Sequence, residues 1–174
     1  MPAADAPPRE GLSWQELCES PHFAVLDGIP FKVETNRWGQ VVLSQPPLFQ
    51  HSYFQKRIIR RLDVLAGEDG EAFPEVSVET AEGVKVPDVG WFTHERMEAV
   101  REAFAVPIAP EICVEVLSPW NAWGEIQEKV RLYLAAGAEE AWVCDVAGRM
   151  RFFDASGELP RSLRVPAFPL AIEP

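Results

Sequence analysis

The chain has 174 residues, of which 47% are hydrophobic and 25% are charged, so a single domain with a substantial core is expected. No apolar run approaches the roughly 20 residues that a membrane span needs. The net charge of −11 argues against strong non-specific binding of nucleic acid, which depends on basic surface. Any nuclease hypothesis has to accommodate this charge.

Residues 1–10 lack the basic and apolar segments of a signal peptide and are typical of a flexible Ala/Pro tail. We therefore expect the domain to span residues 11–174. The three cysteines, Cys18, Cys113 and Cys144, form no C-x-x-C pair and are too few for a disulfide framework. A reducing cytoplasm is the predicted compartment.

The first half of the chain predicts two helices and a hairpin. A capping-box pattern at Ser13 begins a short helix that ends near Glu19. Two β-rich runs at 31–35 and 40–44 flank an Asn/Gly turn and predict a β-hairpin. Apolar residues at helical spacing then predict a helix over about 48–66.

The second half alternates predicted strands and helices. The predicted strands are 76–80, 84–92, 112–117, 141–146 and 150–153, and the predicted helices are 93–104 and 124–136. The unit of strand 112–117, helix 124–136 and strand 141–146 normally gives two parallel strands joined by a right-handed crossover. Because the other strands should be antiparallel, we predict an α/β fold with a mixed sheet, followed by an extended tail over 160–174.

Glu115 is the one charge inside an apolar run that is typical of a strand buried on both faces. A buried carboxylate needs a partner, a metal or a raised pKa. Alternatively, the strand lies near an edge of the sheet and Glu115 faces water.

Asp88 follows a proline that restricts strand pairing, so it is expected at an edge or a strand end. There its carboxylate could face a neighbouring strand. Two carboxylates from adjacent strands form a hard oxygen site suited to Mg²⁺ or Mn²⁺. An Asp and a Glu far apart in the sequence are weak support by themselves.

Lys129 adjoins the predicted sheet-facing stripe of its helix, which contains Ile126, Val130 and Tyr133. A lysine on the shoulder of an apolar face often extends into water. It could instead reach over the C-terminal end of strand 112–117, where ligands bind in open α/β sheets. In that position it would stabilise an attacking hydroxide or a charged transition state.

The helix predicted over 48–66 also carries four basic residues, Lys56, Arg57, Arg60 and Arg61. A solvated helix face is the simpler explanation. A surface that contacts phosphates is the alternative.

Several short motifs occur in a fixed order along the chain. They are Val86-Pro87-Asp88-Val89, Val114-Glu115-Val116-Leu117-Ser118-Pro119, Glu128-Lys129 with Tyr133, Ala136-Gly137, and Glu140-Ala141-Trp142-Val143-Cys144-Asp145. Together they resemble the Uma2 (DUF820) family, a bacterial branch of the PD-(D/E)XK restriction-endonuclease-like superfamily. The resemblance extends over about residues 23–168.

The resemblance implies a four-stranded mixed sheet flanked by helices, with Asp88 and Glu115 as ligands of Mg²⁺ or Mn²⁺. The superfamily's lysine normally follows the glutamate by two residues, but that position here is Leu117. In this branch the lysine has moved to the following helix, which selects Lys129. The superfamily also tends to have an acidic residue near its N-terminal helix. Glu34 is the candidate in this chain, and Asp27 is its rival.

His51 matches a histidine that is common in the family. It could act as a ligand, as a base or in packing at the helix end. Because histidines are often simply hydrogen-bonded and no partner is visible in the sequence, we favour a structural or supporting role.

These residues predict a divalent-metal-dependent endonuclease or related phosphodiesterase, with nucleic acid, chiefly DNA, as substrate and no membrane partner. A homodimer is the expected assembly. The alternative is a nuclease-like fold that serves as a binding or assembly protein, a function that the acidic charge would suit. A purely structural cation held by the acidic residues is a third possibility, but it leaves Lys129 unexplained.

Overall fold

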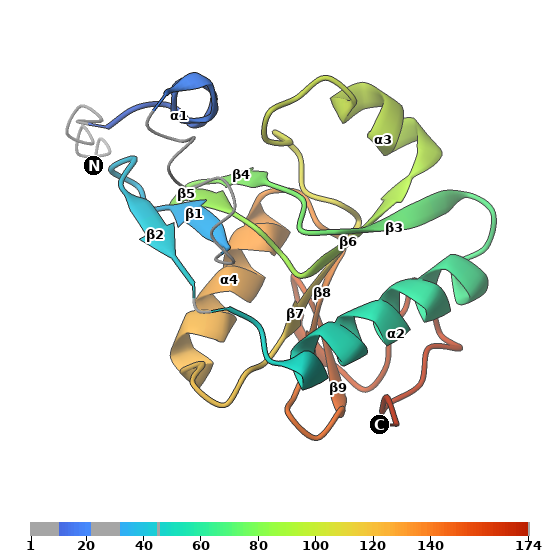
Figure 1. Cartoon of the computed structure of the whole chain (residues 1–174). Coiled ribbons are helices and arrows are strands. Elements are labelled where there is room, and N and C mark those ends of the chain that lie inside the picture. Colours follow the sequence, from blue (N-terminus) through green and yellow to red (C-terminus); the bar gives the residue numbers. More distant parts are fainter. Residues whose placement is uncertain (1–10, 22–31, 45, 174) are drawn as a thin grey trace, which may run out of the picture.

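The computed structural model describes residues 11–21, 32–44 and 46–173. Its centre is a six-stranded sheet in the order β10-β9-β8-β7-β6-β3 (Figure 1). The strands are β3 (Gly70–Pro74), β6 (Val89–Thr93), β7 (Ile112–Val116), β8 (Glu140–Cys144), β9 (Met150–Asp154) and β10 (Gly157–Leu159). β7 and β8 are parallel, and every other neighbouring pair is antiparallel. The mixed α/β sheet and its βαβ unit are therefore confirmed.

Two helices cover the sheet on opposite faces. On α2 (Phe49–Leu65), every fourth residue is buried, and these residues pack against alternate positions of β7. On α4 (Trp123–Ala135), Ile126 and Val130 pack against the other face, through Ala141 and Val143 of β8. Full burial of one aliphatic side chain contributes roughly 1.5–3 kcal/mol, so these buried residues hold both helices on the sheet.

The remaining elements lie around this core. They are α1 (Trp14–Glu19), the hairpin β1 (Val33–Thr35) and β2 (Val41–Leu43), the hairpin β4 (Val78–Thr80) and β5 (Gly83–Lys85), and α3 (His94–Val100). The predicted capping box of α1 is present, with the Ser13 and Glu16 side chains each bonded to the other's backbone N–H. The turn of the first hairpin uses Gly39 at φ 76°, a conformation that favours glycine.

Two predicted elements had wrong boundaries, and two strands were missed. The single strand expected over 84–92 is two strands, β5 and β6, because the chain leaves the small hairpin at Pro87 and enters the central sheet. The helix expected over 93–104 ends at Val100, and the chain then turns back to form a bridge between Val106 and Val78. β3 and β10 were missed, and with them the sheet has six strands rather than four. Both are edge strands with mixed burial, so they lack a clear apolar pattern.

The C-terminal segment has no helix over residues 160–173 and contributes three buried side chains to the core. Phe168 is one of them, and its ring centroid lies 4.6 Å from that of Trp142. Within the described ranges, every helix is too short or too polar to traverse a bilayer. The flexible tail predicted for residues 1–10 lies outside the described part of the chain.

Candidate functional site

Asp88 lies directly before β6, at the point where that strand approaches β7. The antiparallel register pairs Val89 with Val114, so its next step would place Asp88 opposite Glu115. The main-chain N–H of Val116 donates to Asp88 Oδ2 at 2.7 Å, and Gln55 Nε2 donates to the Asp88 carbonyl at 2.7 Å. Asp88 is therefore buried, with its carboxylate held by the sheet and its main-chain carbonyl held by α2.

Glu115 projects from β7 toward α4. Tyr133 of α4 donates its hydroxyl to Glu115 Oε1 at 2.5 Å, and Lys129 Nζ lies 3.4 Å from the same oxygen. Among the described residues, no donor contacts Oε2, and Glu115 lines a cleft. The alternative of an edge strand with Glu115 in water is wrong, because β7 is central and Glu115 is only 4% exposed.

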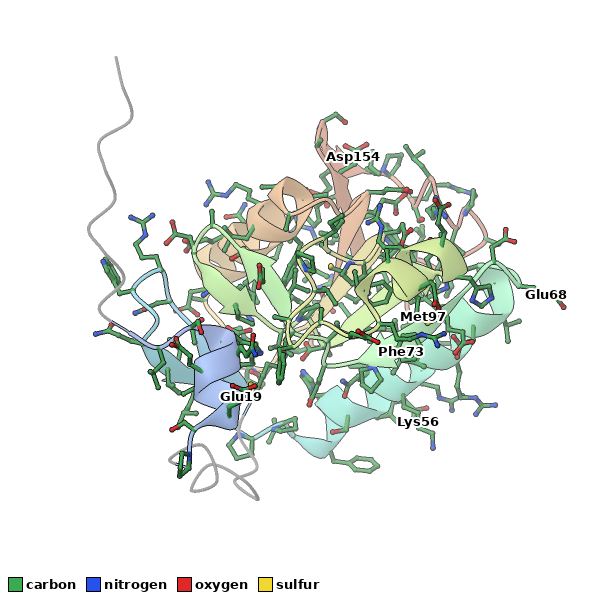
Figure 2. The ribbon with its side chains drawn as sticks, turned by 90° about the horizontal axis from the view of Figure 1, so that it is seen from above. Glu19, Lys56, Glu68, Phe73, Met97 and Asp154 are labelled. Carbon is green, nitrogen blue, oxygen red and sulfur yellow. The ribbon has the colours of Figure 1, made fainter. Side chains whose placement is uncertain are left out.

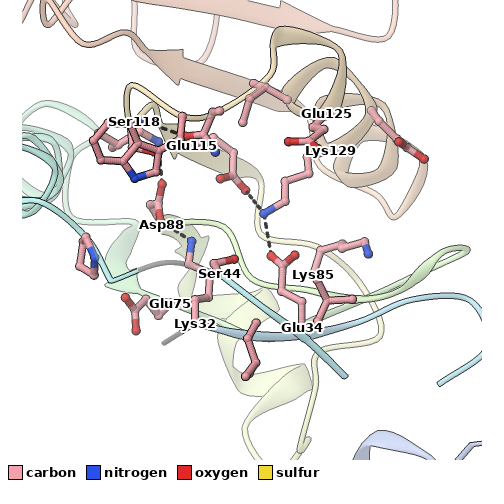
Figure 3. Close-up of a pocket in the computed structure, with 18 of the residues that line it drawn as sticks. Lys32, Glu34, Ser44, Glu75, Lys85, Asp88, Glu115, Ser118, Glu125 and Lys129 are labelled. Atoms are coloured by element: carbon pink, nitrogen blue, oxygen red, sulfur yellow. Dashed lines mark hydrogen bonds and ion pairs between the residues drawn. The ribbon is translucent and has the colours of Figure 1, made fainter. Parts of the chain in front are cut away.

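Lys129 points inward rather than into bulk water. Its ammonium lies 2.7 Å from Glu34 Oε1, so it joins β1 to the end of β7 (Figure 3). Glu34 itself is buried and accepts a hydrogen bond from the Val86 N–H at 2.9 Å. The structure thus brings Glu34 to the other predicted residues, whereas Asp27 lies outside the described part of the chain.

Lys32 is a member of the cluster that the sequence interpretation missed. Its ammonium donates to Asp88 Oδ1, and its side chain is only 14% exposed (Figure 3). A signal was available, since Lys32 and Glu34 are two positions apart in a predicted strand and should share a face. Gln55 was also missed, although it is one helical turn from His51 and should lie beside it.

His51 of α2 lies with Nε2 at 3.1 Å from Asp88 Oδ2. Its other ring nitrogen, Nδ1, is buried without a hydrogen-bond partner among the described residues. From this position the imidazole can orient a carboxylate of the cluster, and the supporting role stays a prediction.

Burial is the largest influence on the ionisation of both carboxylates. It would raise the pKa of Asp88, but the Lys32 ammonium and the hydrogen bond from His51 outweigh it and hold the pKa below its usual range. Burial raises the pKa of Glu115, and the nearby Asp88 adds to this effect against the opposing charges of Lys129 and Lys32. The two carboxylates therefore have unlike affinities for protons.

The two ammonium groups stay charged in the cluster. Burial would lower the pKa of Lys129, but the carboxylates of Glu115 and Glu34 outweigh it and raise the pKa. The pKa of Lys32 is likewise raised, since Asp88 offsets the cost of burial. Burial and the neighbouring Glu115 raise the pKa of Tyr133, so its hydroxyl remains a donor.

The cluster lies in a cleft of about 850 Å³. Carboxylates outnumber ammonium groups along its lining: the acidic residues are Glu34, Glu75, Glu82, Asp88, Glu115, Glu125 and Glu128, and the lysines are Lys32, Lys85 and Lys129. Without a cation such a cleft repels phosphate. A bound divalent ion would reduce that repulsion.

The donor set suits a hard divalent cation. No group of three or more His, Cys, Asp or Glu side chains poised to hold a metal occurs in the described ranges. Mg²⁺ nevertheless needs only one or two carboxylates, with waters and substrate oxygens completing its coordination. Asp88 and Glu115 supply two carboxylates, and no donor among the described residues contacts Oε2 of Glu115. The residues therefore fit Mg²⁺ or Mn²⁺.

The chain has recognisable relatives. A crystal structure entitled as that of a putative nuclease belonging to DUF820, from Anabaena variabilis ATCC 29413, superimposes with a TM-score of 0.72 at 19% sequence identity. The match covers 92% of this chain and 94% of the other, and at this identity it shows a shared fold. A search of curated proteins gave no match. The model of the Uma2 family, described as "Putative restriction endonuclease", matches residues 14–154, and the chain therefore belongs to the Uma2 family.

Proposed function

We propose that this protein is a divalent-metal-dependent phosphodiester hydrolase that acts on nucleic acid, with DNA as the expected substrate. One observation carries the proposal. The ammonium of Lys129 lies within reach of Glu115, which is adjacent to Asp88 at the end of two paired strands, inside a cleft. Two buried carboxylates beside a buried cation are a costly arrangement for stability alone, which favours a catalytic purpose.

Asp88 and Glu115 would hold Mg²⁺ or Mn²⁺. When bound, such an ion lowers the pKa of a water molecule and polarises a phosphoryl oxygen. The carboxylate of Asp88 is oriented for this task by Val116 N–H and His51, and that of Glu115 by the Tyr133 hydroxyl. Partners of this kind usually contribute strongly to metal affinity.

Lys129 would stabilise the attacking hydroxide or the negative charge that develops on the phosphate. Its raised pKa keeps it cationic at neutral pH, as this role requires. Glu34 acts through Lys129, since its carboxylate holds the ammonium over the end of β7. We therefore assign Glu34 as a positioning residue rather than as a further metal ligand.

The proposal is tested with purified protein, supercoiled plasmid and Mg²⁺ or Mn²⁺. Wild type should nick or linearise the plasmid, and both Asp88→Ala and chelation by EDTA should abolish this cleavage. Calorimetry should detect a divalent ion bound to wild type but not to Asp88→Ala. Equal background cleavage by both proteins, together with no ion binding, would falsify the proposal.

A second function is favoured by the existing charge balance. Asp88 already has two basic partners, Lys32 and His51, so the cluster is largely neutralised without a metal. A nuclease fold of this kind could act as a binding or assembly protein with little catalysis. Light scattering after size-exclusion chromatography, combined with a Mn²⁺ titration, separates the two. A stable homodimer without metal affinity favours the assembly protein, whereas a dimer that binds Mn²⁺ favours the nuclease.

A further inference from the structure

One side of α2 carries four basic residues that take no part in the cluster. Lys56, Arg57, Arg60 and Arg61 lie on neighbouring turns, and we call them the α2 basic stripe. At 100° per residue, Lys56 and Arg60 project opposite the helix's buried face, and Arg57 and Arg61 project from the side of the helix between the two faces. Figure 2 shows Lys56 extending from α2 away from the rest of the protein.

Among the described residues, the stripe differs from most other basic residues in having no acidic partners. Within the described ranges, none of its four side chains forms an ion pair, whereas most other lysines and arginines do. Three other described residues also form no ion pair, and they are far apart in the sequence: Lys85, Arg131 and Arg161. A chain with a net charge of −11 has ample carboxylates to pair four adjacent cations, so their lack of partners points to an external anion.

The side chain of Tyr53 contacts one member of the stripe, Arg57. The guanidinium of Arg57 receives no carboxylate but contacts the Tyr53 hydroxyl, at 3.0 Å from Nε and 2.7 Å from Nη2. Its central carbon lies 5.0 Å from the centre of the Tyr53 ring. Stacking orders the guanidinium while leaving it charged, which lowers the entropic cost of binding an anion.

The same helix connects the stripe to the candidate site. His51 and Gln55 of α2 contact Asp88, and the stripe begins at the next residue, Lys56. With a rise of about 1.5 Å per residue, the distance from Gln55 to Arg61 along the helix axis is about 9 Å. Duplex DNA carries about one phosphate charge per 1.7 Å of axis, so several phosphates fall within that length.

We infer that the α2 basic stripe binds the phosphate backbone of a nucleic acid beside the segment that enters the cleft. The inference rests on the proposed function, since it names where that substrate is held. It also explains how a protein with a net charge of −11 could bind nucleic acid, because the acidic lining of the cleft cannot supply the affinity for phosphate. The α2 basic stripe supplies that affinity from the outer side of α2, the helix that contacts Asp88.

The test measures binding without cleavage. A fluorescently labelled duplex of about 20 base pairs, or two helical turns, is titrated with protein in EDTA at several KCl concentrations, with DNA and RNA duplexes as separate arms. The variant is the triple substitution Lys56→Ala/Arg57→Ala/Arg60→Ala. Its control, Arg101→Ala/Arg131→Ala/Arg161→Ala, removes the same charge from exposed sites elsewhere. Thermal unfolding checks that both variants are folded.

We expect wild type to bind at least one duplex and the stripe variant to bind at least tenfold more weakly at low salt. Each lost phosphate contact should reduce the slope of log K against log salt by about 0.9, or about 2.7 for three contacts. The control should retain most of the affinity and the wild-type slope. Equal affinity and slope in the two variants, or no binding of either duplex by wild type, overturns the inference.

Failure of the proposed function gives a different result. If wild type binds through the stripe but never cleaves with Mg²⁺ or Mn²⁺, the hydrolase proposal fails and the stripe inference stands. If Asp88→Ala binds like wild type and only cleavage is lost, both stand.

Discussion

Lys129 of α4 and Glu34 of β1 are 95 residues apart in the sequence, and their side chains meet at 2.7 Å. Glu34 is in turn fixed by the Val86 N–H, close to Asp88. This contact ties the N-terminal hairpin to the end of the sheet that carries Asp88 and Glu115. It also gives the displaced lysine a definite orientation, which a position on a helix face alone would not.

Glu34→Gln is expected to reduce metal-dependent cleavage by about tenfold to a hundredfold. The amide can still accept from Val86 N–H, but it no longer balances the Lys129 charge. The free energy of unfolding should fall by about 1–3 kcal/mol, measured by urea denaturation. Glu79→Gln, at an exposed position of β4, is the matched control and should change neither quantity. Wild-type cleavage by Glu34→Gln would contradict the positioning role.

Tyr133→Phe should weaken Mn²⁺ binding by about tenfold to a hundredfold, because it removes the donor to Glu115 Oε1. Isothermal titration calorimetry measures the affinity directly. The matched control is Tyr53→Phe on α2, whose hydroxyl contacts Arg57 and not the carboxylates. If both variants bind Mn²⁺ like wild type, Tyr133 does not orient a metal ligand.

Lys32→Met is expected to separate stability from metal binding. Without metal, loss of the cation leaves the Asp88 carboxylate, among the described residues, with His51 and Val116 N–H as partners, and the free energy of unfolding should fall by about 1–3 kcal/mol. Mn²⁺ should restore more stability to this variant than to wild type, since a competitor for Asp88 Oδ1 has been removed. Thermal unfolding with and without Mn²⁺ measures both effects. Equal Mn²⁺-induced shifts in the two proteins would argue against Asp88 as a ligand.

The raised pKa of Glu115 predicts a pH dependence of metal-free stability. The folded protein binds this proton more tightly than the unfolded chain, in which a glutamate titrates near pH 4.3. The contribution of Glu115 to stability therefore falls as pH rises above about 4.3, until the folded-state pKa has been passed. Asp88 has the opposite sign, because its lowered pKa makes its contribution disappear only as pH falls below about 3.9.

This dependence is isolated by comparing wild type with Glu115→Gln in urea denaturation at a series of pH values. The stability of wild type relative to the variant should decline as pH rises above about 4.3. A difference that stays constant, or grows with pH, would show that the pKa of Glu115 is not raised.

The fold could largely be predicted because its central elements have strong local patterns. The apolar run of β7, the amphipathic stripe of α4 and the run of β8 define a βαβ unit by periodicity alone. β3 and β10 were missed because these edge strands are short and only partly buried, so their residues show no clear apolar alternation. Their pairing depends on neighbours that are distant in the sequence.

Some residues of the candidate site could also be predicted, because they stand out in the local sequence. Glu115 is conspicuous as a charge in an apolar strand, and Asp88 follows a proline at a strand end. Lys32 escaped notice because a single lysine at the start of a strand is ordinary at most protein surfaces. Only the packing of the hairpin against β5 and the central sheet makes Lys32 a partner of Asp88.

The most direct measurement is the single-turnover rate of duplex cleavage in Mg²⁺ by wild type, Asp88→Asn and Lys129→Met, with Arg131→Met as the control on the exposed side of α4. Wild type and the control should cleave at similar rates. Asp88→Asn and Lys129→Met should each lose at least about a hundredfold in rate while remaining folded. Cleavage by either variant at the wild-type rate, or no Mg²⁺-dependent cleavage by wild type, would contradict a hydrolytic site built from Asp88, Glu115 and Lys129.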